Sequence, residues 1–258
     1  MICMLLAAEL NELAEISGIT AAIALTIGFI LAFIVLGKAI RTGQRILFLF
    51  FLCVVFTLSP WYPSGGGFVY WVLTGEPLDY WAYVLIGTVG IPIAILAWLD
   101  VYMTTIKPEK KSKVLWTYAI VSIIFELYMV YFLFLAPDAP VESMLGVFKA
   151  EDNFIDIDYK GFVLVYLALS IVLAVTTGVH FSITSMKIED NPEIRYKGKF
   201  LLIAFLLFGF CAISDAVIPM TPILLVIVRF LLTACTFFYY LGFILPKWTK
   251  KLLGLEIE

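Results

Sequence analysis

Seven long apolar segments, separated by short polar or Gly/Pro-rich breaks, most constrain what this chain can fold into. A helix that crosses a bilayer needs about 20 mostly apolar residues. The segments that meet this requirement are 18–37, 45–63, 80–106, 113–136, 161–186, 199–218 and 222–246. Only 14% of the residues are charged and the mean hydropathy is +1.04, so a soluble enzyme and a nucleic-acid-binding domain are excluded. The sequence therefore predicts an all-α, polytopic membrane protein with seven transmembrane helices.

The distribution of basic residues predicts the orientation of these helices. Most of the 17 Lys and Arg residues fall in the breaks at 38–45, 107–113 and 187–199 or in the tail that starts at Lys247. These breaks alternate along the chain, and positive charge is retained on the cytoplasmic side of a membrane. We therefore expect a multi-pass protein of the cell membrane with its N-terminus outside and its C-terminus in the cytoplasm.

The same pattern divides the chain into two parts. Residues 1–246 are predicted to form a single seven-helix transmembrane domain, and residues 247–258 a short, basic, amphipathic cytoplasmic tail. The longest outer loop, 137–160, contains the alternating stretch Phe154-Ile-Asp-Ile-Asp-Tyr159 after the turn-forming residues Glu151-Asp152-Asn153. Alternation of this kind predicts a β-hairpin in the loop.

An ion pair is predicted where the sixth and seventh segments meet. Ionisable side chains are costly in hydrocarbon and usually face the interior of a helix bundle. Asp215 lies about one helical turn, and Arg229 about two turns, from the Pro219–Pro222 turn that joins these segments. Their contact would fix two helices together, or it would bind or gate a ligand.

Three aromatic residues are candidates for the wall of a pocket near that ion pair. Trp61 and Tyr62 lie within the stretch Ser59-Pro-Trp-Tyr-Pro-Ser-Gly-Gly-Gly67, which we expect to break the second helix, and Trp71 follows it. Irregular backbone at membrane depth is tolerated where it is buried or lines a wet cavity. The alternative interpretation is a belt of aromatic residues at the membrane interface.

Three further ionisable residues lie inside predicted helices. Glu126 is near the midplane and continues a polar stripe with Tyr118 and Ser122, so it is either a helix–helix hydrogen-bonding group or a proton or cation site. Asp100 and His180 lie at similar depth near the cytoplasmic end and would meet if their helices touch.

The single histidine argues against most metal enzymes of the membrane. Zinc and iron sites need several nitrogen or carboxylate ligands, and the chain has one His. We therefore expect no metal site and no catalytic residue, and an enzyme is disfavoured.

The size and the seven-span topology resemble those of microbial rhodopsins. That family attaches retinal to a Lys in the seventh helix, whereas segment 222–246 contains Arg229 as its only basic residue. No covalent retinal, and no other cofactor, is therefore expected. Asp100-Val101-Tyr102 is similar to the Asp-Arg-Tyr motif of seven-helix G-protein-coupled receptors. The chain thus resembles rhodopsin- or receptor-like bundles, within an uncharacterised archaeal-type seven-transmembrane family.

Two functional hypotheses follow. The first is a receptor- or sensor-like protein that binds a small molecule or lipid in an outer-half pocket and signals through a separate cytoplasmic partner. Its candidate ligand-binding residues are Trp61, Tyr62, Trp71, Asp215 and Arg229. The alternative is a small-solute or proton-coupled transporter that uses Glu126, with Asp100 and His180 as further intramembrane candidates. Both require the lipid bilayer and neither requires nucleic acid, and the sequence leaves the oligomeric state open.

Overall fold

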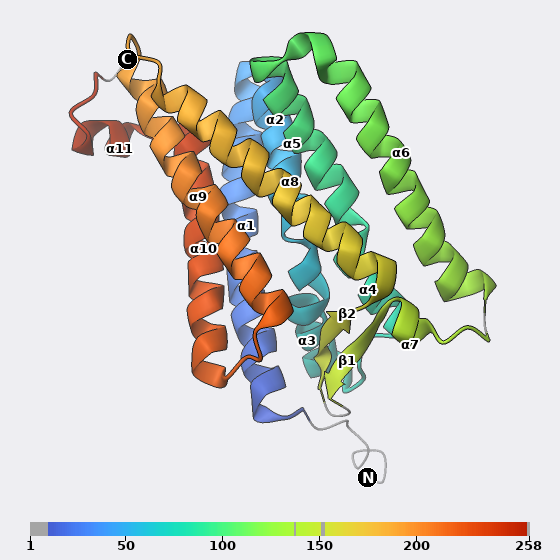
Figure 1. The fold of residues 1–258 in the computed structure, drawn as a ribbon. Helices are drawn as coiled ribbons and strands as arrows, with labels where there is room; N and C mark the ends of the chain where they lie inside the picture. Colours follow the sequence, from blue (N-terminus) through green and yellow to red (C-terminus); the bar gives the residue numbers. More distant parts are fainter. Residues whose placement is uncertain (1–9, 137, 151–152, 257–258) are drawn as a thin grey trace.

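The chain folds into a bundle of long helices, and a small β-sheet closes the bundle at one end (Figure 1). The computed structural model describes residues 10–136, 138–150 and 153–256. Within these ranges, seven helical segments are long and apolar enough to cross a membrane, which is the number predicted from the sequence. They are Glu12–Thr42, Arg45–Thr74, Tyr80–Ile106, Pro108–Leu135, Gly161–Met186, Pro192–Val217 and Pro222–Ile244.

Several of these segments consist of more than one element. The helices are α1 (Glu12–Thr42), α2 (Arg45–Thr57), α3 (Tyr62–Thr74), α4 (Tyr80–Thr88), α5 (Gly90–Ile106), α6 (Lys111–Val130), α7 (Val141–Met144), α8 (Gly161–Met186), α9 (Pro192–Val217), α10 (Pro222–Ile244) and α11 (Lys247–Leu252), and the strands are β1 (Gly146–Ala150) and β2 (Asn153–Tyr159). Short 3₁₀ turns precede α3 and α6, and a turn of π-helix follows α6.

Helix α1 extends beyond its apolar run at both ends because of its capping residues. The Asn11 side chain accepts a hydrogen bond from the Ala14 backbone N–H at 2.8 Å, which caps the N-terminus. At the other end Gly43 adopts φ 64°, a conformation that glycine reaches without strain and that ends the helix. Only Gly43 and Gln44 separate α1 from α2, so these two helices are tightly connected.

The predicted break in the second span is shorter than the sequence indicates. A 3₁₀ turn at Ser59–Trp61 interrupts the helix, but the glycine run 65–67 is helical within α3. A Cβ atom placed on Gly65 would lie 2.8 Å from the backbone nitrogen of Ala22 in α1. The predicted break over 59–67 is therefore confirmed at Ser59–Trp61, but it does not extend to the glycines, because at least Gly65 is needed for close packing between two helices.

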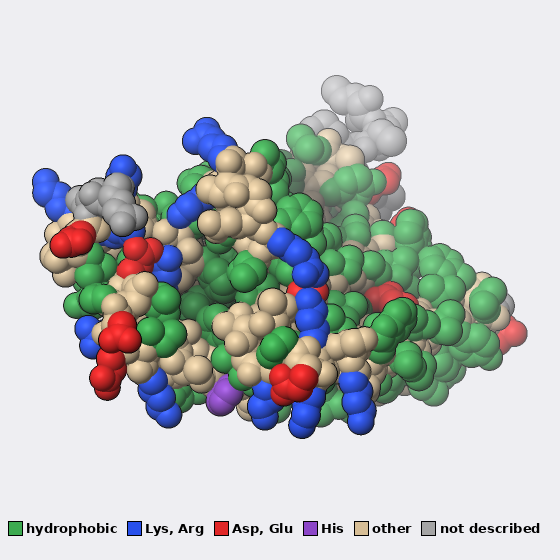
Figure 2. All heavy atoms as spheres, turned by 90° about the horizontal axis from the view of Figure 1, so that it is seen from above, with side chains coloured by type: hydrophobic (Ala, Val, Ile, Leu, Met, Phe, Trp, Pro, Cys, Tyr) green, Lys and Arg blue, Asp and Glu red, His purple; other side chains and the backbone are tan. Residues whose placement is uncertain are grey.

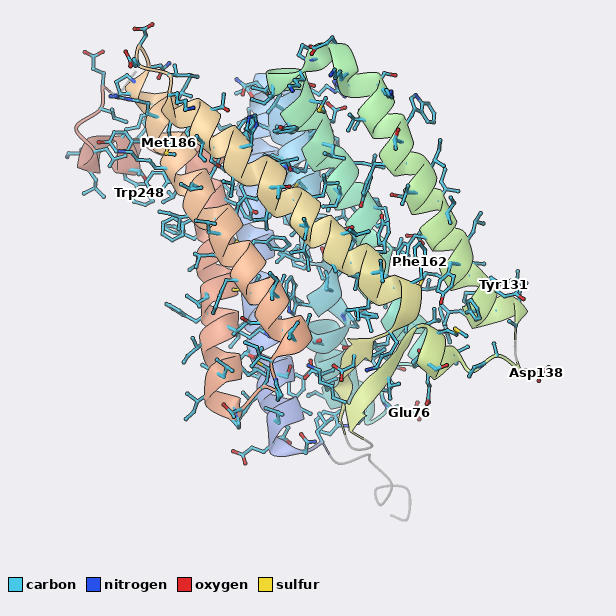
Figure 3. All side chains as sticks on the ribbon, in the orientation of Figure 1. Glu76, Tyr131, Asp138, Phe162, Met186 and Trp248 are labelled. Carbon is cyan, nitrogen blue, oxygen red and sulfur yellow. The ribbon has the colours of Figure 1, made fainter. Side chains whose placement is uncertain are left out.

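The helices pack in an uneven ring. Helix α9 packs between α8 and α10, α10 packs on α1, and α1 also contacts α2 and α3. Helix α5 packs on α2 and α6, and α6 stands at the edge of the bundle (Figure 1). Side chains such as Tyr131 project outward from the far end of this edge segment, whereas Phe162 at the start of α8 faces it (Figure 3).

The predicted β-hairpin is confirmed and closes one end of the bundle. Strands β1 and β2 pair antiparallel, with Gly146 opposite Tyr159. The Tyr80 hydroxyl donates to the Gly146 carbonyl at 2.7 Å, and the Tyr83 hydroxyl donates to the Ile155 carbonyl at 2.5 Å. Residues 151–152 of the predicted turn lie outside the described residues. We call this end of the bundle the hairpin face.

Lysine and arginine side chains gather at the opposite end, which we call the basic face (Figure 2). It is formed by the loops 38–45, 107–113 and 187–199 and by α11. Glu193 at the start of α9 pairs with Lys197 at 2.6 Å and with Lys250 of α11 at 2.5 Å. The Trp248 ring of α11 stacks on Phe237 of α10, with ring centroids 6.4 Å apart (Figure 3). These contacts hold the tail helix against the bundle.

Candidate functional site

The predicted ion pair between the last two spanning helices is confirmed. Arg229 Nη1 of α10 lies 3.0 Å from Asp215 Oδ2 of α9 and donates a hydrogen bond to it. The arginine side chain is only 3% exposed. Charged groups in such an environment are stable only when paired, so this contact fastens the ends of α9 and α10 together.

Two further residues lie beside this ion pair and form a larger cluster with it. Asp156 of β2 places Oδ1 4.0 Å from Arg229 Nη2. The Trp61 indole N–H donates to Asp215 Oδ2 at 2.8 Å, and its ring centroid lies 5.9 Å from the guanidinium carbon. We call Trp61, Asp156, Asp215 and Arg229 the buried charge cluster. It joins the hairpin, the second span, α9 and α10 at one point.

The charges of the cluster do not balance when every group is ionised. Two carboxylates face one guanidinium, which leaves one negative charge in a buried site. Burial raises the pKa of Asp156 above its ordinary value of 3.8, and the neighbouring Arg229 partly opposes this rise. Arg229 Nε is also buried and has no hydrogen-bond partner among the described residues. Burial therefore favours the neutral form of Asp156 more than it would favour that of an exposed carboxyl.

The structure brings together three of the five residues predicted for the pocket. Trp61, Asp215 and Arg229 belong to the cluster. The Tyr62 hydroxyl instead donates to the Val55 carbonyl, and its ring packs against Phe29 with centroids 5.4 Å apart. Trp71 packs against Phe68 and Phe154, at centroid distances of 6.0 and 6.5 Å. Tyr62 and Trp71 thus fasten neighbouring elements to each other.

Asp156 is the functional residue that sequence reasoning missed. It was assigned only to an alternating hairpin strand, on which one face normally meets water. In the structure its side chain is buried, and so is the neighbouring Ile155. Two successive buried residues show that β2 is covered on both faces, and an alternating pattern alone does not indicate this.

The polar stripe around Glu126 forms a second cluster between α6 and α8. The Tyr166 hydroxyl lies 2.9 Å from the Tyr118 hydroxyl and 2.9 Å from Ser122 Oγ, and Tyr118 also contacts Ser170 at 3.2 Å. Glu126 lies one turn further along α6, and its Oε1 is buried without a hydrogen-bond partner among the described residues.

Asp100 and His180 take different partners instead of meeting. Asp100 lies 2.6 Å from Arg45 Nη2 and 2.8 Å from Lys111 Nζ. His180 Nδ1 shares a hydrogen bond with the Tyr102 hydroxyl at 3.0 Å. Asp100 thus ties α2 to α6 at the basic face, whereas His180 joins α8 to α5.

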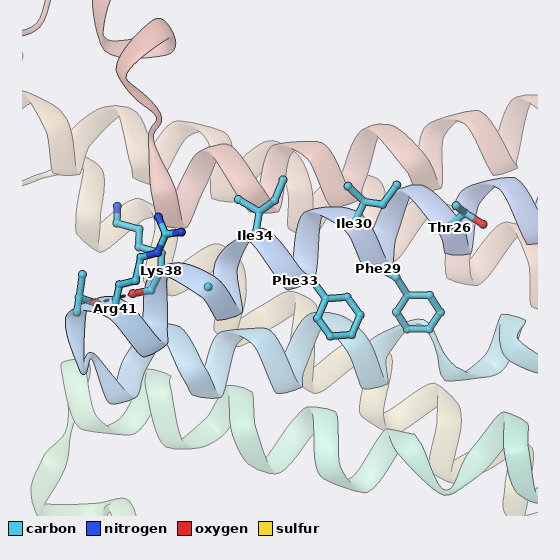
Figure 4. Close-up of a pocket in the computed structure, with 9 residues that line it drawn as sticks. Thr26, Phe29, Ile30, Phe33, Ile34, Lys38 and Arg41 are labelled. Atoms are coloured by element: carbon cyan, nitrogen blue, oxygen red, sulfur yellow. Dashed lines mark hydrogen bonds between the residues drawn. The ribbon is translucent and has the colours of Figure 1, made fainter.

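No group of three or more His, Cys, Asp or Glu side chains within the described ranges is arranged to hold a metal ion. A groove of about 920 Å³ runs along α1 (Figure 4). It is lined by Thr26, Phe29, Ile30, Phe33, Ile34, Gly37, Lys38, Arg41 and Thr42. All of these residues belong to one helix, and Phe33 is 57% exposed, as expected of a surface that faces lipid.

Comparison with known proteins gives no match, whether to a family model, to a curated protein or to a solved structure. Function is therefore inferred from the contacts, burial and charges of the side chains themselves.

Proposed function

We propose that this chain is a receptor- or sensor-like protein of the cell membrane, which binds a small molecule or lipid at the hairpin face and signals through a separate partner at the basic face. The observation that carries the proposal is the buried charge cluster, because it ties the hairpin to the ends of two spanning helices. A ligand that moves the hairpin would therefore also act on α9 and α10.

The asymmetry of basic residues supports the orientation of this signal path. Lys and Arg gather on the basic face, and such loops are retained in the cytoplasm during insertion (Figure 2). In the proposed orientation the hairpin face and the N-terminus are outside and α11 lies on the cytoplasmic side. A ligand arriving from outside would meet the hairpin first, and a partner in the cytoplasm would meet the loops of the basic face.

Energetics support the coupling between the hairpin and the helices. Arg229 is almost fully buried and has two carboxylates beside it, Asp215 of α9 at 3.0 Å and Asp156 of β2 at 4.0 Å. Moving β2 away from α10 would remove the attraction between Asp156 and Arg229 at a site with little access to water. Loss of this attraction makes independent movement of β2 and α10 unfavourable. A ligand therefore shifts the helices if it binds one hairpin position better than another.

The exposed side chains of the hairpin face indicate the class of ligand. They include the carboxylates Glu76, Asp79, Glu142 and Asp158 together with Trp81, and these carboxylates outnumber the two exposed lysines of the hairpin face, Lys149 and Lys160. Figure 3 shows Glu76 and Asp138 at this end of the molecule. Negative charge beside an aromatic surface attracts cationic or dipolar small molecules and disfavours anions.

Hydrogen-exchange mass spectrometry of the protein in nanodiscs tests the proposal. Candidate ligands are first selected by thermal shift from a library of amines and neutral small molecules. A bound ligand should slow exchange in β1 and β2 and change exchange in the loop 187–191, which precedes α9 at the basic face. The Asp156→Asn variant should keep the slower exchange in the two strands and lose the change of exchange in the loop. Asp158→Asn, which changes an exposed carboxylate of the same strand, is the matched control, and at saturating ligand it should keep both effects. Unchanged exchange of the loop in ligand-bound wild type would refute the signal path.

A second function has one specific observation in its favour. Glu126 Oε1 is buried without a hydrogen-bond partner among the described residues, as a proton or cation carrier inside a membrane would be. A proton-coupled transporter predicts pH-driven uptake into liposomes that Glu126→Gln abolishes. Glu109→Gln, in an exposed loop, is the control and should leave uptake unchanged. Equal uptake by the two variants would assign Glu126 a structural role.

A further inference from the structure

A second groove opens between α2, α5 and α6 near the basic face, whereas the buried charge cluster lies at the hairpin face. Its volume is about 710 Å³. The lining residues are Leu49, Leu52, Ile93, Leu96, Ala97, Asp100, Pro108, Lys111, Ser112, Leu115, Trp116 and Ala119. Most of them are aliphatic or aromatic, and the charged and hydroxyl groups come from the segment nearest the basic face. The groove is therefore amphipathic along its length.

Two cations are held at the polar end of this groove by one carboxylate. Asp100 Oδ2 lies 2.6 Å from Arg45 Nη2, and Asp100 Oδ1 lies 2.8 Å from Lys111 Nζ. Lys111 also donates to the Thr104 hydroxyl at 2.9 Å. One carboxylate balances one of the two positive charges, so the group keeps a net charge of +1. Asp100 thereby fixes the position of the cations and leaves them able to attract an anion.

The exposure of these groups shows which of them a ligand can reach. The Asp100 side chain is 12% exposed, that of Lys111 is 24% exposed and that of Arg45 is 65% exposed. The carboxylate thus lies behind the two cations. Ser112, one residue beyond Lys111, is exposed and adds a hydroxyl donor to the same end. An anion that approaches from the membrane surface would meet donors before it meets the carboxylate.

We propose that this groove binds an anionic phospholipid of the surrounding bilayer. The phosphate of the headgroup would lie against Arg45, Lys111 and Ser112, and an acyl or isoprenoid chain would run along Leu49, Leu52, Leu96 and Leu115. Charge complementarity favours this occupant, because the groove is cationic at the level of the headgroups and apolar at the level of the chains. A zwitterionic lipid fits the apolar part equally well but gains less from the net positive charge.

The position of the groove also favours a lipid over a soluble anion. Three of its sides are helices that are long and apolar enough to span a membrane, and Trp116 at its edge is 68% exposed. Side chains of this kind face lipid in a membrane protein, and tryptophan is enriched at the interface of the bilayer. An inorganic ion would use the cations and leave the apolar length of the groove unfilled.

Native mass spectrometry of the purified full chain tests this inference. The protein is equilibrated in detergent with an equimolar mixture of phosphatidylglycerol and phosphatidylcholine that carry identical acyl chains. Wild type should retain the anionic lipid in preference, and the preference should fall as ionic strength rises. Each cation near an anionic headgroup favours it about fivefold, so Lys111→Gln should lower the preference by about that factor. Lys113→Gln, an exposed position on the same helix that does not line the groove, is the matched control and should leave the preference unchanged.

Two further variants keep the test decisive if Lys111→Gln impairs folding. Lys111→Arg keeps the charge and should retain the lipid preference. Ala119→Trp narrows the apolar part of the groove, and it should reduce retention of both lipids while leaving the charges in place. Equal retention of the two lipids by wild type would overturn the proposal, and so would an equal loss in the Lys111→Gln and Lys113→Gln variants. Displacement of the lipid by millimolar inorganic phosphate would identify a site for soluble anions instead.

Discussion

Replacing Arg229 by methionine is expected to destabilise the protein more than replacing Arg229 and Asp215 together. Arg229→Met leaves Asp215 and Asp156 close to each other without a cation, so the buried site carries two negative charges. Breaking a buried pair in this way costs about 3–5 kcal/mol of unfolding free energy. Asp215→Asn should cost an amount near the lower end of that range, because Asp156 remains 4.0 Å from Arg229 Nη2.

The double variant, Arg229→Met with Asp215→Asn, should be more stable than the sum of the two single changes predicts. The amide that replaces the Asp215 carboxylate still offers an oxygen to the Trp61 indole N–H, which donates to Asp215 at 2.8 Å in the wild type, and the charge that remains is on Asp156. We expect the departure from additivity to be about 1–3 kcal/mol. Reversible unfolding in a single bilayer mimetic measures all four free energies. Additivity within about 0.5 kcal/mol would refute the reasoning, because independent sites behave in that way.

Two other predictions concern how the hairpin is held. Burial raises the pKa of Asp156 above 3.8, so the folded state binds more protons than the unfolded state between those two pKa values. The unfolding free energy of wild type, relative to that of Asp156→Asn, should thus be greatest below about pH 4 and should fall as the pH rises through the folded pKa of Asp156. A difference in unfolding free energy that does not change with pH would contradict this. Gly87→Ala should loosen the hairpin and cost about 1–3 kcal/mol, because the new Cβ would lie 2.5 Å from Tyr159 Oη. Gly66→Ala, whose Cβ would meet nothing within 4 Å, is the control, and equal hydrogen exchange of β2 in the two variants would disprove the contact.

The spanning helices could be predicted from hydropathy because lipid imposes one simple requirement on them. The predicted segments 80–106 and 161–186 coincide with Tyr80–Ile106 and Gly161–Met186. The ends of α1 and α9 were predicted less well, since hydropathy reports the apolar part of a helix and not its caps. Helix α9 begins at Pro192, where the Asn191 side chain accepts from the Ile194 backbone N–H at 3.2 Å, well before its apolar run.

The candidate site could be predicted only as far as local geometry extends. Asp215 and Arg229 lie on consecutive antiparallel helices, so their depths from the shared turn are sufficient to bring them together. Asp156 comes from a loop between other helices, and its contact depends on how the whole bundle is assembled. Asp100 and His180 show the same limit, because equal depth in the membrane does not determine which way a helix is rotated about its axis.

The cluster around Arg229 also imposes an order on biosynthesis. Asp156 and then Asp215 precede Arg229 along the chain, so both carboxylates leave the ribosome before the arginine of α10. Until α10 inserts, Asp215 of α9 lacks its cation, and Asp156 of β2 has no arginine to contact. A nascent chain that lacks α10 thus differs from the finished protein, because no arginine neutralises its carboxylates at one membrane boundary. Arrival of a single guanidinium supplies the missing positive charge and completes the contact between the hairpin, α9 and α10.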